Sequence, residues 1–290
     1  MIVGTRGSNL AVVQTEKVCE RLSELGVECE IKTVQSLGDV MTDRGLYEMP
    51  TIGVFVKKLD MMLLDAKIDI AVHSMKDMPS EREEGLETSA VLPRDSPYDA
   101  LVSRYRLDDM PEGAVIGTSS VRRRYQFLNY VGERGVKVTI KDIRGNVDTR
   151  IAKFRRGEYD SVILAEAGFE RLKLDIEYER LDRDPFVPSP RQGIIAVVAR
   201  RGSKESEILK QIDDSETRIE AEVEEEVLKV IGGGCSLPVG VHATAKGGAV
   251  ELAVYVAASD ARYKLEKVVL GKDYYMEETR KFAQTFKSYR

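Results

Sequence analysis

Residues 69–79 read Asp69-Ile70-Ala71-Val72-His73-Ser74-Met75-Lys76-Asp77-Met78-Pro79. The run Ile68–Val72 is short, apolar and rich in β-branched residues, which predicts a strand buried on both faces. A cluster of polar side chains follows at once, between His73 and Asp77. Since ligands of open α/β sheets bind beyond the carboxyl ends of the strands, this pattern predicts a site. Taken alone, an ordinary turn after a strand explains the cluster equally well.

The composition is that of an ordinary soluble globular protein, with 42% apolar and 32% charged residues. At 290 residues the chain is too long for one small core, and two or three domains are expected. No apolar run approaches the ~20 residues that a membrane-spanning helix needs. The chain begins with a strand-like Met1–Gly4, so we expect no signal peptide, no membrane association and a cytoplasmic location.

Charge and cysteine content argue against several classes of function. The formal net charge of −5 disfavours a nucleic-acid partner, because phosphate binding needs a basic face. Three cysteines without a CxxC pair, together with only two histidines, disfavour a disulfide framework and a structural zinc site. We therefore expect no metal.

The first part of the chain has the pattern of an α/β lobe. Strands are expected at residues 2–5, 27–34, 68–72 and 86–92, and helices at residues 9–25 and 54–64. Residues 36–53 contain several Gly, Asp and Thr and little periodicity, which indicates a long mobile loop.

The second part of the chain contains the same kind of strand-to-helix turn as the first. Gly117-Thr118-Ser119-Ser120 leaves a strand and enters a helix, as Gly4-Thr5-Arg6-Gly7-Ser8 does near the N-terminus. Strands are expected at residues 100–103, 114–116, 136–140 and 161–165, with a helix that ends near residue 156. A further apolar strand at residues 194–199 follows a proline-containing linker, so we expect the chain to return there and complete the first sheet.

This pattern predicts three domains. Domain 1 comprises residues 1–94 and 194–213, domain 2 residues 98–187 and domain 3 residues 214–290. Two α/β lobes joined by two crossings form a hinge, and we expect a cleft between them. Residues 205–230 are expected to be helical, followed by strands at 239–245, 250–258 and 263–270 and a helix from residue 274, which makes the last domain a small α+β unit.

Arginines are the first chemical signal, because five of them lie in or just after loops that follow predicted strands: Arg6, Arg122, Arg123, Arg144 and Arg150. Guanidinium groups bind carboxylates bidentately, and helix N-termini favour anions. The arrangement predicts a site for a small molecule with several carboxylates or phosphates. Arg122-Arg123-Arg124 by itself is also compatible with a charged surface helix.

Asp77 and Cys235 are the other candidates for chemistry. A carboxylate beside Lys76 can act as a general acid or base, or stabilise a developing cation, although a turn or cap is a common alternative. Cys235 follows three glycines, Gly232-Gly233-Gly234, which allow the backbone to approach a ligand closely. A covalent attachment point fits this thiol better than a cysteine–histidine pair, and a buried glycine-rich turn remains an alternative.

Over nearly its full length the chain resembles the hydroxymethylbilane synthase family, also known as porphobilinogen deaminase. The residues that carry the resemblance are Gly4-Thr5-Arg6-Gly7-Ser8-Asn9-Leu10-Ala11, residues 69–79, Gly117-Thr118-Ser119-Ser120-Val121-Arg122-Arg123, Arg144-Gly145-Asn146, Thr149-Arg150, Gln192-Gly193 and Gly233-Gly234-Cys235. The combination and its order are specific. The resemblance implies an α/β fold with two periplasmic-binding-protein-like lobes around a cleft and a small α+β C-terminal domain.

The resemblance also implies the chemistry: a transferase that deaminates porphobilinogen and joins four units head to tail into the linear tetrapyrrole hydroxymethylbilane. A dipyrromethane cofactor is expected on Cys235 through a thioether, and Asp77 is the expected catalytic carboxylate. The implied cofactor contacts are Ser74, Lys76, Thr118, Ser119, Ser120, Arg122, Arg123, Gly145 and Arg150. The implied substrate contacts are Arg6, Ser8, Gln14, Arg144, Arg150 and Gln192. Porphobilinogen is the expected partner, and a monomer the expected state.

Three departures from the family pattern remove positive charge. Acidic or apolar residues stand where the family has basic ones, at Glu48, Ile52, Glu177 and Glu225. Arg44, Lys57 and Arg191 are candidates for compensation. Two alternatives therefore stay open, namely a non-enzymatic polycarboxylate-binding module of the same fold and a paralogue with reduced turnover.

Overall fold

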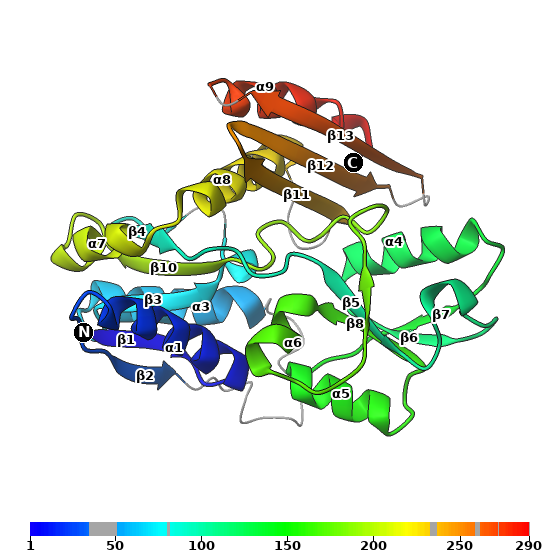
Figure 1. Cartoon of the computed structure of the whole chain (residues 1–290), viewed down its shortest axis with the longest axis horizontal. Coiled ribbons are helices and arrows are strands. Elements are labelled where there is room, and N and C mark those ends of the chain that lie inside the picture. Colours follow the sequence, from blue (N-terminus) through cyan, green and yellow to red (C-terminus); the bar gives the residue numbers. More distant parts are fainter. Residues whose placement is uncertain (35–50, 80–81, 233–236, 259–261, 272, 290) are drawn as a thin grey trace. The chain divides into compact units, whose positions relative to one another are not determined.

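The computed structural model of the chain divides into two compact units (Figure 1). The first unit comprises residues 1–95 and 193–218, and the second comprises residues 96–192 and 219–290. The structure describes residues 1–34, 51–79, 82–232, 237–258, 262–271 and 273–289, with only the backbone of residues 51–55. None of the helices in these ranges is long and apolar enough to cross a membrane. The division into three domains stays a prediction.

The first unit contains a five-stranded sheet in the order β2-β1-β3-β10-β4. Strands β1, β2 and β3 are parallel, and β10 runs antiparallel between β3 and β4. Its elements are β1 (Ile2–Arg6), α1 (Asn9–Ser23), β2 (Glu30–Val34), α3 (Thr51–Leu64), β3 (Ile70–Ser74), β4 (Leu86–Val91), β10 (Ile195–Arg200) and α7 (Lys204–Leu209). The expected return of the chain to complete the first sheet is confirmed.

Helices cover both faces of this sheet. Val18 and Leu22 of α1 pack with Ile70 and Val72 of β3 in one buried cluster, which also takes in Leu209 of α7. Helix α3 lies on the opposite face, where a Cβ atom on Gly4 would overlap Ile68 Cδ1 and stand 3.1 Å from Leu59 Cδ2. A larger residue at position 4 would therefore force the side chain of Ile68 to move.

The second unit repeats the same plan with the order β7-β6-β8-β5-β9. Here β6 is parallel to β7 and β8, while β5 is antiparallel to β8 and β9. The elements are β5 (Asp99–Ser103), β6 (Val115–Gly117), α4 (Val121–Gly132), β7 (Thr139–Lys141), α5 (Val147–Arg155), β8 (Ser161–Ala165), α6 (Glu166–Leu172) and β9 (Glu179–Leu181). This order, with a reversed strand next to the end of the sheet, is that of a periplasmic-binding-protein-like lobe, and both units have it.

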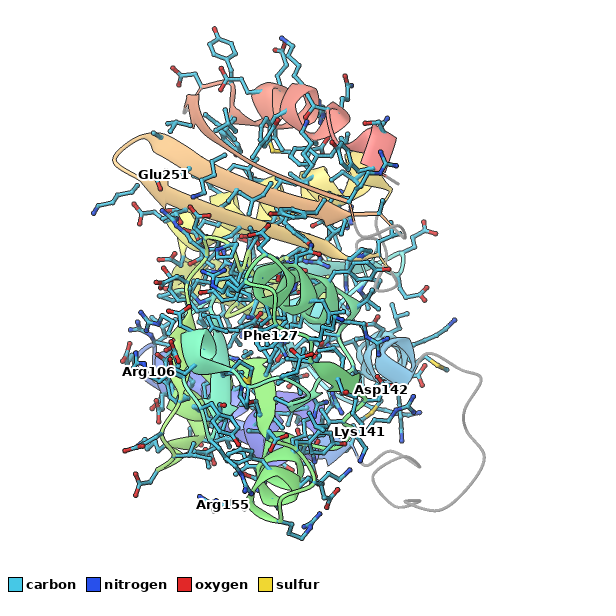
Figure 2. The ribbon with its side chains drawn as sticks, turned by 90° about the vertical axis from the view of Figure 1, so that its right-hand side faces the viewer. Arg106, Phe127, Lys141, Asp142, Arg155 and Glu251 are labelled. Carbon is cyan, nitrogen blue, oxygen red and sulfur yellow. The ribbon has the colours of Figure 1, made fainter. Side chains whose placement is uncertain are left out.

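Two buried clusters flank the second sheet. Phe127 of α4, labelled in Figure 2, packs with Ile116 and Ile163 on one face. Ile151 of α5 and Phe169 of α6 pack on the other face. Because the strands are covered on both sides, their burial is nearly continuous, as the apolar runs in the sequence predict.

The C-terminal part of the second unit is an antiparallel meander of β11 (Val239–Lys246), β12 (Ala249–Ala257) and β13 (Tyr263–Gly271). Helices α8 (Ser215–Ile231) and α9 (Tyr275–Gln284) lie beside it (Figure 1). Val223 and Val227 of α8 share one buried cluster with Ala283 of α9 and the inward side chains of the sheet. The predicted α/β fold class with a small C-terminal sheet domain is confirmed.

The structure corrects several predicted boundaries. The helix expected at 54–64 begins at Thr51, so the last three residues assigned to the long loop are helical; the rest of that loop, residues 36–50, lies outside the described residues. The continuous helix expected at 205–230 is two helices, because Asp213 and Asp214 interrupt it. The strand expected at 68–72 spans residues 70–74 instead. Helix α6 and strand β9 are additional to the predicted elements.

Candidate functional site

The polar cluster of residues 73–77 lies at the carboxyl edge of the first sheet. Strand β3 ends at Ser74, and its parallel neighbour β1 ends at Arg6, with Gly4 opposite Ala71 in the register. A single 3-10 turn, Met75–Asp77, follows β3 directly. Arg6 and Ser74 therefore leave the sheet at the same edge, which is where such sheets bind ligands.

The turn that presents Asp77 is held on both sides. The Met75 backbone N–H donates to Ile194 O at 3.0 Å, and the Met78 N–H donates to Met75 O at 3.1 Å. The side chains of Met75 and Met78 are buried, whereas those of Lys76 and Asp77 are half-buried. The Asp77 carboxylate makes no hydrogen bond or ion pair with any residue that the structure describes. The fold thus fixes the backbone of this carboxylate and leaves its oxygens available to a ligand.

Two of the predicted ligand contacts bond to one another. Gln14 Nε2 of α1 lies 2.8 Å from Ser74 Oγ, and this hydroxyl lies 3.1 Å from Gln14 Oε1. Gln14 is buried, so the pair fixes Ser74 at the end of β3. Ser8, another predicted contact, is the N-cap of α1 and accepts a hydrogen bond from Ala11 N at 3.3 Å.

His73 lies beneath this edge and is buried. Burial first, and then the positive charges of Arg82 and Arg6, lower the pKa of its imidazole to about 3. The side chain is therefore neutral at physiological pH. Its Nε2 atom has no hydrogen-bond partner among the described residues.

In the second unit, the predicted hydroxyl cluster organises the loops at the ends of β6 and β7. Ser120 is the N-cap of α4, and its Oγ accepts from Arg123 N at 3.4 Å. Ser119 Oγ donates to Ile143 O at 2.9 Å and accepts from Ile143 N at 3.0 Å. Thr118 Oγ1 accepts from Ser120 N at 3.2 Å. These bonds connect the turn after β6 with the loop that carries Arg144.

That loop has a shape that requires glycine. Gly145 has a φ of +115°, and a Cβ atom on it would lie 2.8 Å from Thr149 Cγ2. Arg150 Nε donates to Gly145 O at 2.7 Å, and Lys153 Nζ donates to Arg144 O at 3.2 Å. Arg144 is exposed and Arg150 is half-buried. The structure therefore groups Arg144, Gly145 and Arg150 in one loop at the start of α5.

Arg122 and Arg123 share a buried carboxylate, Asp99. Arg122 Nη1 lies 2.7 Å from Asp99 Oδ2, and Arg123 donates to Asp99 Oδ1 from Nη2 at 2.8 Å and from Nε at 3.1 Å. Gln192 Nε2 donates to Asp99 Oδ1 at 2.9 Å. Gln126 Oε1 accepts from Arg122 at 3.0 Å.

Electrostatics keep Asp99 ionised. Burial would raise the pKa of its carboxyl, but the charges of Arg122 and Arg123 and the hydrogen bonds from Arg122 and Gln192 outweigh burial. The net effect holds the pKa well below its usual range. This carboxylate fixes the directions of both guanidinium groups.

The structure describes only some of the other residues that the sequence analysis named. Cys235 and Glu48 lie outside the described residues, as does Arg44; at Ile52 only the backbone is described. Glu177 is exposed, and Glu225 pairs with Lys229 at 3.1 Å. Lys57 is exposed and Arg191 is buried. Within the described part of the chain, no three His, Cys, Asp or Glu side chains are grouped to hold a metal ion.

Sequence reasoning missed Asp99 and the pair Asp60–Arg82 of the first unit. Asp99 stands before an apolar run and looks like a solvated strand end, so only the long-range contacts to α4 reveal its burial. The ion pair between Asp60 Oδ1 and Arg82 Nη2 joins α3 to the segment that follows the turn Met75–Asp77. Asp60 is a charged residue on the buried stripe of a helix. That position in the apolar pattern is the signal that could have identified this ion pair from the sequence.

The topology and the side chains together define a class, that of two-lobed α/β proteins with cationic and hydroxyl groups at the carboxyl ends of their strands. The model of the family "porphobilinogen deaminase, dipyromethane cofactor binding domain" matches residues 1–208. The model of the porphobilinogen deaminase C-terminal domain matches residues 218–285. The chain belongs to the porphobilinogen deaminase family.

Curated relatives support the same membership. A probable porphobilinogen deaminase of Methanocella arvoryzae is 48% identical over 268 residues, which cover 91% of this chain and 87% of the relative. One of Archaeoglobus fulgidus is 45% identical over 282 residues, covering 96% of this chain and 94% of the relative. The activity predicted from the sequence, a transferase of tetrapyrrole biosynthesis that uses porphobilinogen and a dipyrromethane cofactor, is confirmed.

Proposed function

We propose that Asp77 is the catalytic carboxylate of this transferase and that Cys235 carries the dipyrromethane. The observation that carries the first assignment is the fixed, half-buried turn whose carboxylate has no partner among the described residues. A carboxylate so placed can hold a proton for the departing amine of porphobilinogen and stabilise positive charge that develops on a pyrrole nitrogen. Cys235 supports the second assignment by its place after a run of glycines.

The residues at the strand ends fit a cofactor with several carboxylates. When bound, the dipyrromethane supplies the terminal pyrrole carbon to which porphobilinogen units are added. We assign its acetate and propionate groups to the cofactor contacts named from the sequence, with the hydroxyls of Thr118, Ser119 and Ser120 holding the loop geometry. Asp99 would keep Arg122 and Arg123 in fixed directions, so that binding costs little side-chain reordering.

We assign the incoming substrate to the basic groups at the ends of β1 and β7 and to nearby polar side chains. Porphobilinogen carries two carboxylates, and guanidinium groups are their natural partners. The basic groups that we assign to this role are those of Arg6, Arg144 and Arg150. Gln14 would act through Ser74, which it holds in place.

We also propose that the protein works as a monomer in the cytoplasm, without a nucleic-acid partner. The acidic net charge of −5 and the biosynthetic family support this. Light scattering should give the mass of one chain at micromolar concentration; a dimer mass would contradict the proposal.

Intact-mass measurement tests the covalent assignment. After incubation with porphobilinogen, the wild-type chain should gain the mass of two linked pyrrole units, and Cys235→Ser should gain none. Cys19→Ser is the matched control, because burial and a hydrogen bond with Cys29 raise the pKa of that thiol to about 12. Loss of the adduct in Cys19→Ser, or its retention in Cys235→Ser, would refute the assignment.

Rates of ammonia release test Asp77. We expect Asp77→Asn to keep the covalent adduct and lower the rate at least about a hundredfold, the usual scale for a lost general acid–base group. Asp65→Asn is the control, since Asp65 is exposed and, among the described residues, pairs only with Lys67, at 2.9 Å. A rate for Asp77→Asn within twofold of the wild type would exclude the proposed role.

A further inference from the structure

Glu224 is a buried carboxylate of α8 that the proposed site does not yet use. Its side chain is 0% exposed, and the helix that carries it ends at Ile231, shortly before Cys235 in the sequence. Taking a carboxylate out of water is costly unless its oxygens accept hydrogen bonds, so the donors that meet Glu224 indicate what it holds together.

The two oxygens of Glu224 accept hydrogen bonds from two separate parts of the second unit. Oε1 accepts from Ala243 N of strand β11 at 2.8 Å, and Oε2 accepts from Arg191 N. Ala243 lies in the middle of a regular strand, opposite Leu252 of β12. Arg191 lies in a turn, so the carboxylate connects an irregular segment with the C-terminal sheet.

The backbone of Arg191 has a conformation that needs support. Its φ is +61°, in the left-handed region that a residue with a side chain rarely adopts. Such a conformation persists where the surrounding contacts hold it. The bond from Arg191 N to Glu224 is a contact of that kind, because it fixes the peptide group that leads into the strained residue.

The next residue, Gln192, depends on this turn for its direction. Its side chain is buried, and Nε2 donates to Asp99 Oδ1 at 2.9 Å. Arg123 Nη2 lies 3.5 Å from Gln192 Oε1. Gln192 thus connects the turn that Glu224 holds with the carboxylate that directs the two buried arginines of α4.

We propose that Glu224 is a positioning residue of the transferase, which holds the left-handed turn at Arg191 and thereby directs Gln192. The inference rests on the proposed function, because it takes Gln192 to be a substrate contact. Glu224 acts through Gln192 and takes no part in the chemistry itself.

Steady-state kinetics on cofactor-loaded Glu224→Gln test the proposal. The amide has one acceptor oxygen for two backbone donors. The regular strand keeps this oxygen at Ala243, and the strained turn at Arg191 relaxes. We therefore expect KM for porphobilinogen to rise about fivefold or more, with kcat changed less than about threefold, because a binding group is displaced while the turn of Asp77 in the first unit stays intact. Glu224→Asp, whose shorter side chain cannot reach both donors, should raise KM in the same way.

Glu220→Gln is the matched control. Glu220 lies four positions earlier on α8 (224 − 220), is also buried, and accepts from Ala245 N of β11 at 3.0 Å. Weakening this contact should lower stability in urea but leave KM within about twofold of the wild type. A destabilised enzyme with a smaller active fraction loses kcat at unchanged KM, so the split between the two constants separates positioning from a purely structural role.

A double-mutant cycle shows whether Glu224 acts through Gln192. Gln192→Ala should raise KM, and adding Glu224→Gln should raise it by less than about twofold more, because the group that Glu224 directs is then absent. Fully additive effects would overturn the inference. So would a KM within about twofold of the wild type in both Glu224 variants, an equal rise in Glu220→Gln, or a folded Glu224→Gln that gains no pyrrole mass.

The same measurements keep the inference apart from the proposed function. A wild-type chain that gains no pyrrole mass contradicts the proposed function itself. An unchanged KM in Gln192→Ala contradicts the assignment of Gln192 to the substrate, and the inference with it. A loaded, active enzyme in which Gln192→Ala raises KM and the Glu224 variants do not contradicts only the positioning role.

Discussion

The buried imidazole of His73 makes the stability of the protein depend on pH. Burial and the charges of Arg82 and Arg6 lower its pKa to about 3, whereas in the unfolded chain it is about 6.5. Between these values only the unfolded state binds the proton, so the free energy of unfolding decreases as pH falls below 6.5. From pH 7 to pH 5 this contribution amounts to about 2 kcal/mol.

Urea unfolding at the two pH values measures this effect. His73→Gln removes the titrating group, so we expect it to lose about 2 kcal/mol less stability than the wild type between pH 7 and pH 5. Equal losses in both proteins would show that His73 is not buried in its neutral form.

Asp99 is the residue on which the second unit's arginines depend. Its carboxylate is 1% exposed and bonds to Arg122 and Arg123, so Asp99→Ala would leave two buried cations without their counter-charge. We expect a loss of about 3–5 kcal/mol in the free energy of unfolding, measured by urea titration. Asp142→Ala, which breaks the exposed pair with Arg124 at 3.0 Å, should cost less than about 1 kcal/mol. Similar losses in both variants would contradict this account.

The sequence predicted the site at the level of residues that end strands, and it missed the residues that hold them. The structure confirms that Arg6 and Ser74 end strands, that Ser120 caps a helix and that Asp77 lies in the turn after β3, because strand ends and caps have local patterns; their roles in binding and catalysis stay predictions. Asp99 and Arg82 carry no such pattern, since each acquires its partner from another element: Asp99 from α4 and Arg82 from α3.

At the scale of elements, the break between α7 and α8 shows that helical periodicity in the sequence does not by itself reveal where a helix ends. The stretch from residue 205 to 230 keeps helical spacing, yet Asp213 Oδ1 accepts from Val91 N at 2.7 Å and thereby covers the open edge of β4. Asp214 then begins a new helix, with Oδ1 accepting from Thr217 N at 2.8 Å. Helical periodicity in the sequence predicts neither contact. The first joins Asp213 to a strand far away in the sequence, and the second begins a new helix whose residues have the same spacing as the helix before it.

The cap of α8 gives a prediction at this scale. Asp214→Ala removes the acceptor for Thr217 N and should lower the free energy of unfolding by about 1 kcal/mol, whereas Asp214→Asn, a good cap, should lower it by less than half as much. Thermal or urea unfolding followed by circular dichroism measures both. If the alanine and asparagine variants were equally stable, Asp214 would not cap the helix.

At the scale of the whole molecule, the sequence predicted the return of the chain because the apolar run at residues 194–199 follows a second proline-containing linker that mirrors the first. Strand β10 indeed lies between β3 and β4, so the first unit is discontinuous in sequence. The cleft expected between the lobes stays a prediction.

This discontinuity has a consequence for folding. Residues 1–95 alone lack β10, so β3 and β4 lose their shared neighbour and the buried surface of Ile195, Val197 and Ala199.

Asp95 N lies 3.2 Å from Gly193 O, so a short glycine linker can join residues 1–95 to residues 193–218. We expect the joined polypeptide to unfold cooperatively in urea and residues 1–95 alone to show no cooperative transition. Val197→Pro in the joined polypeptide is the control, because a proline in the middle of β10 removes a ladder hydrogen bond inside the sheet and should abolish the transition. A cooperative transition in residues 1–95 alone would mean that this part of the chain completes its sheet without β10.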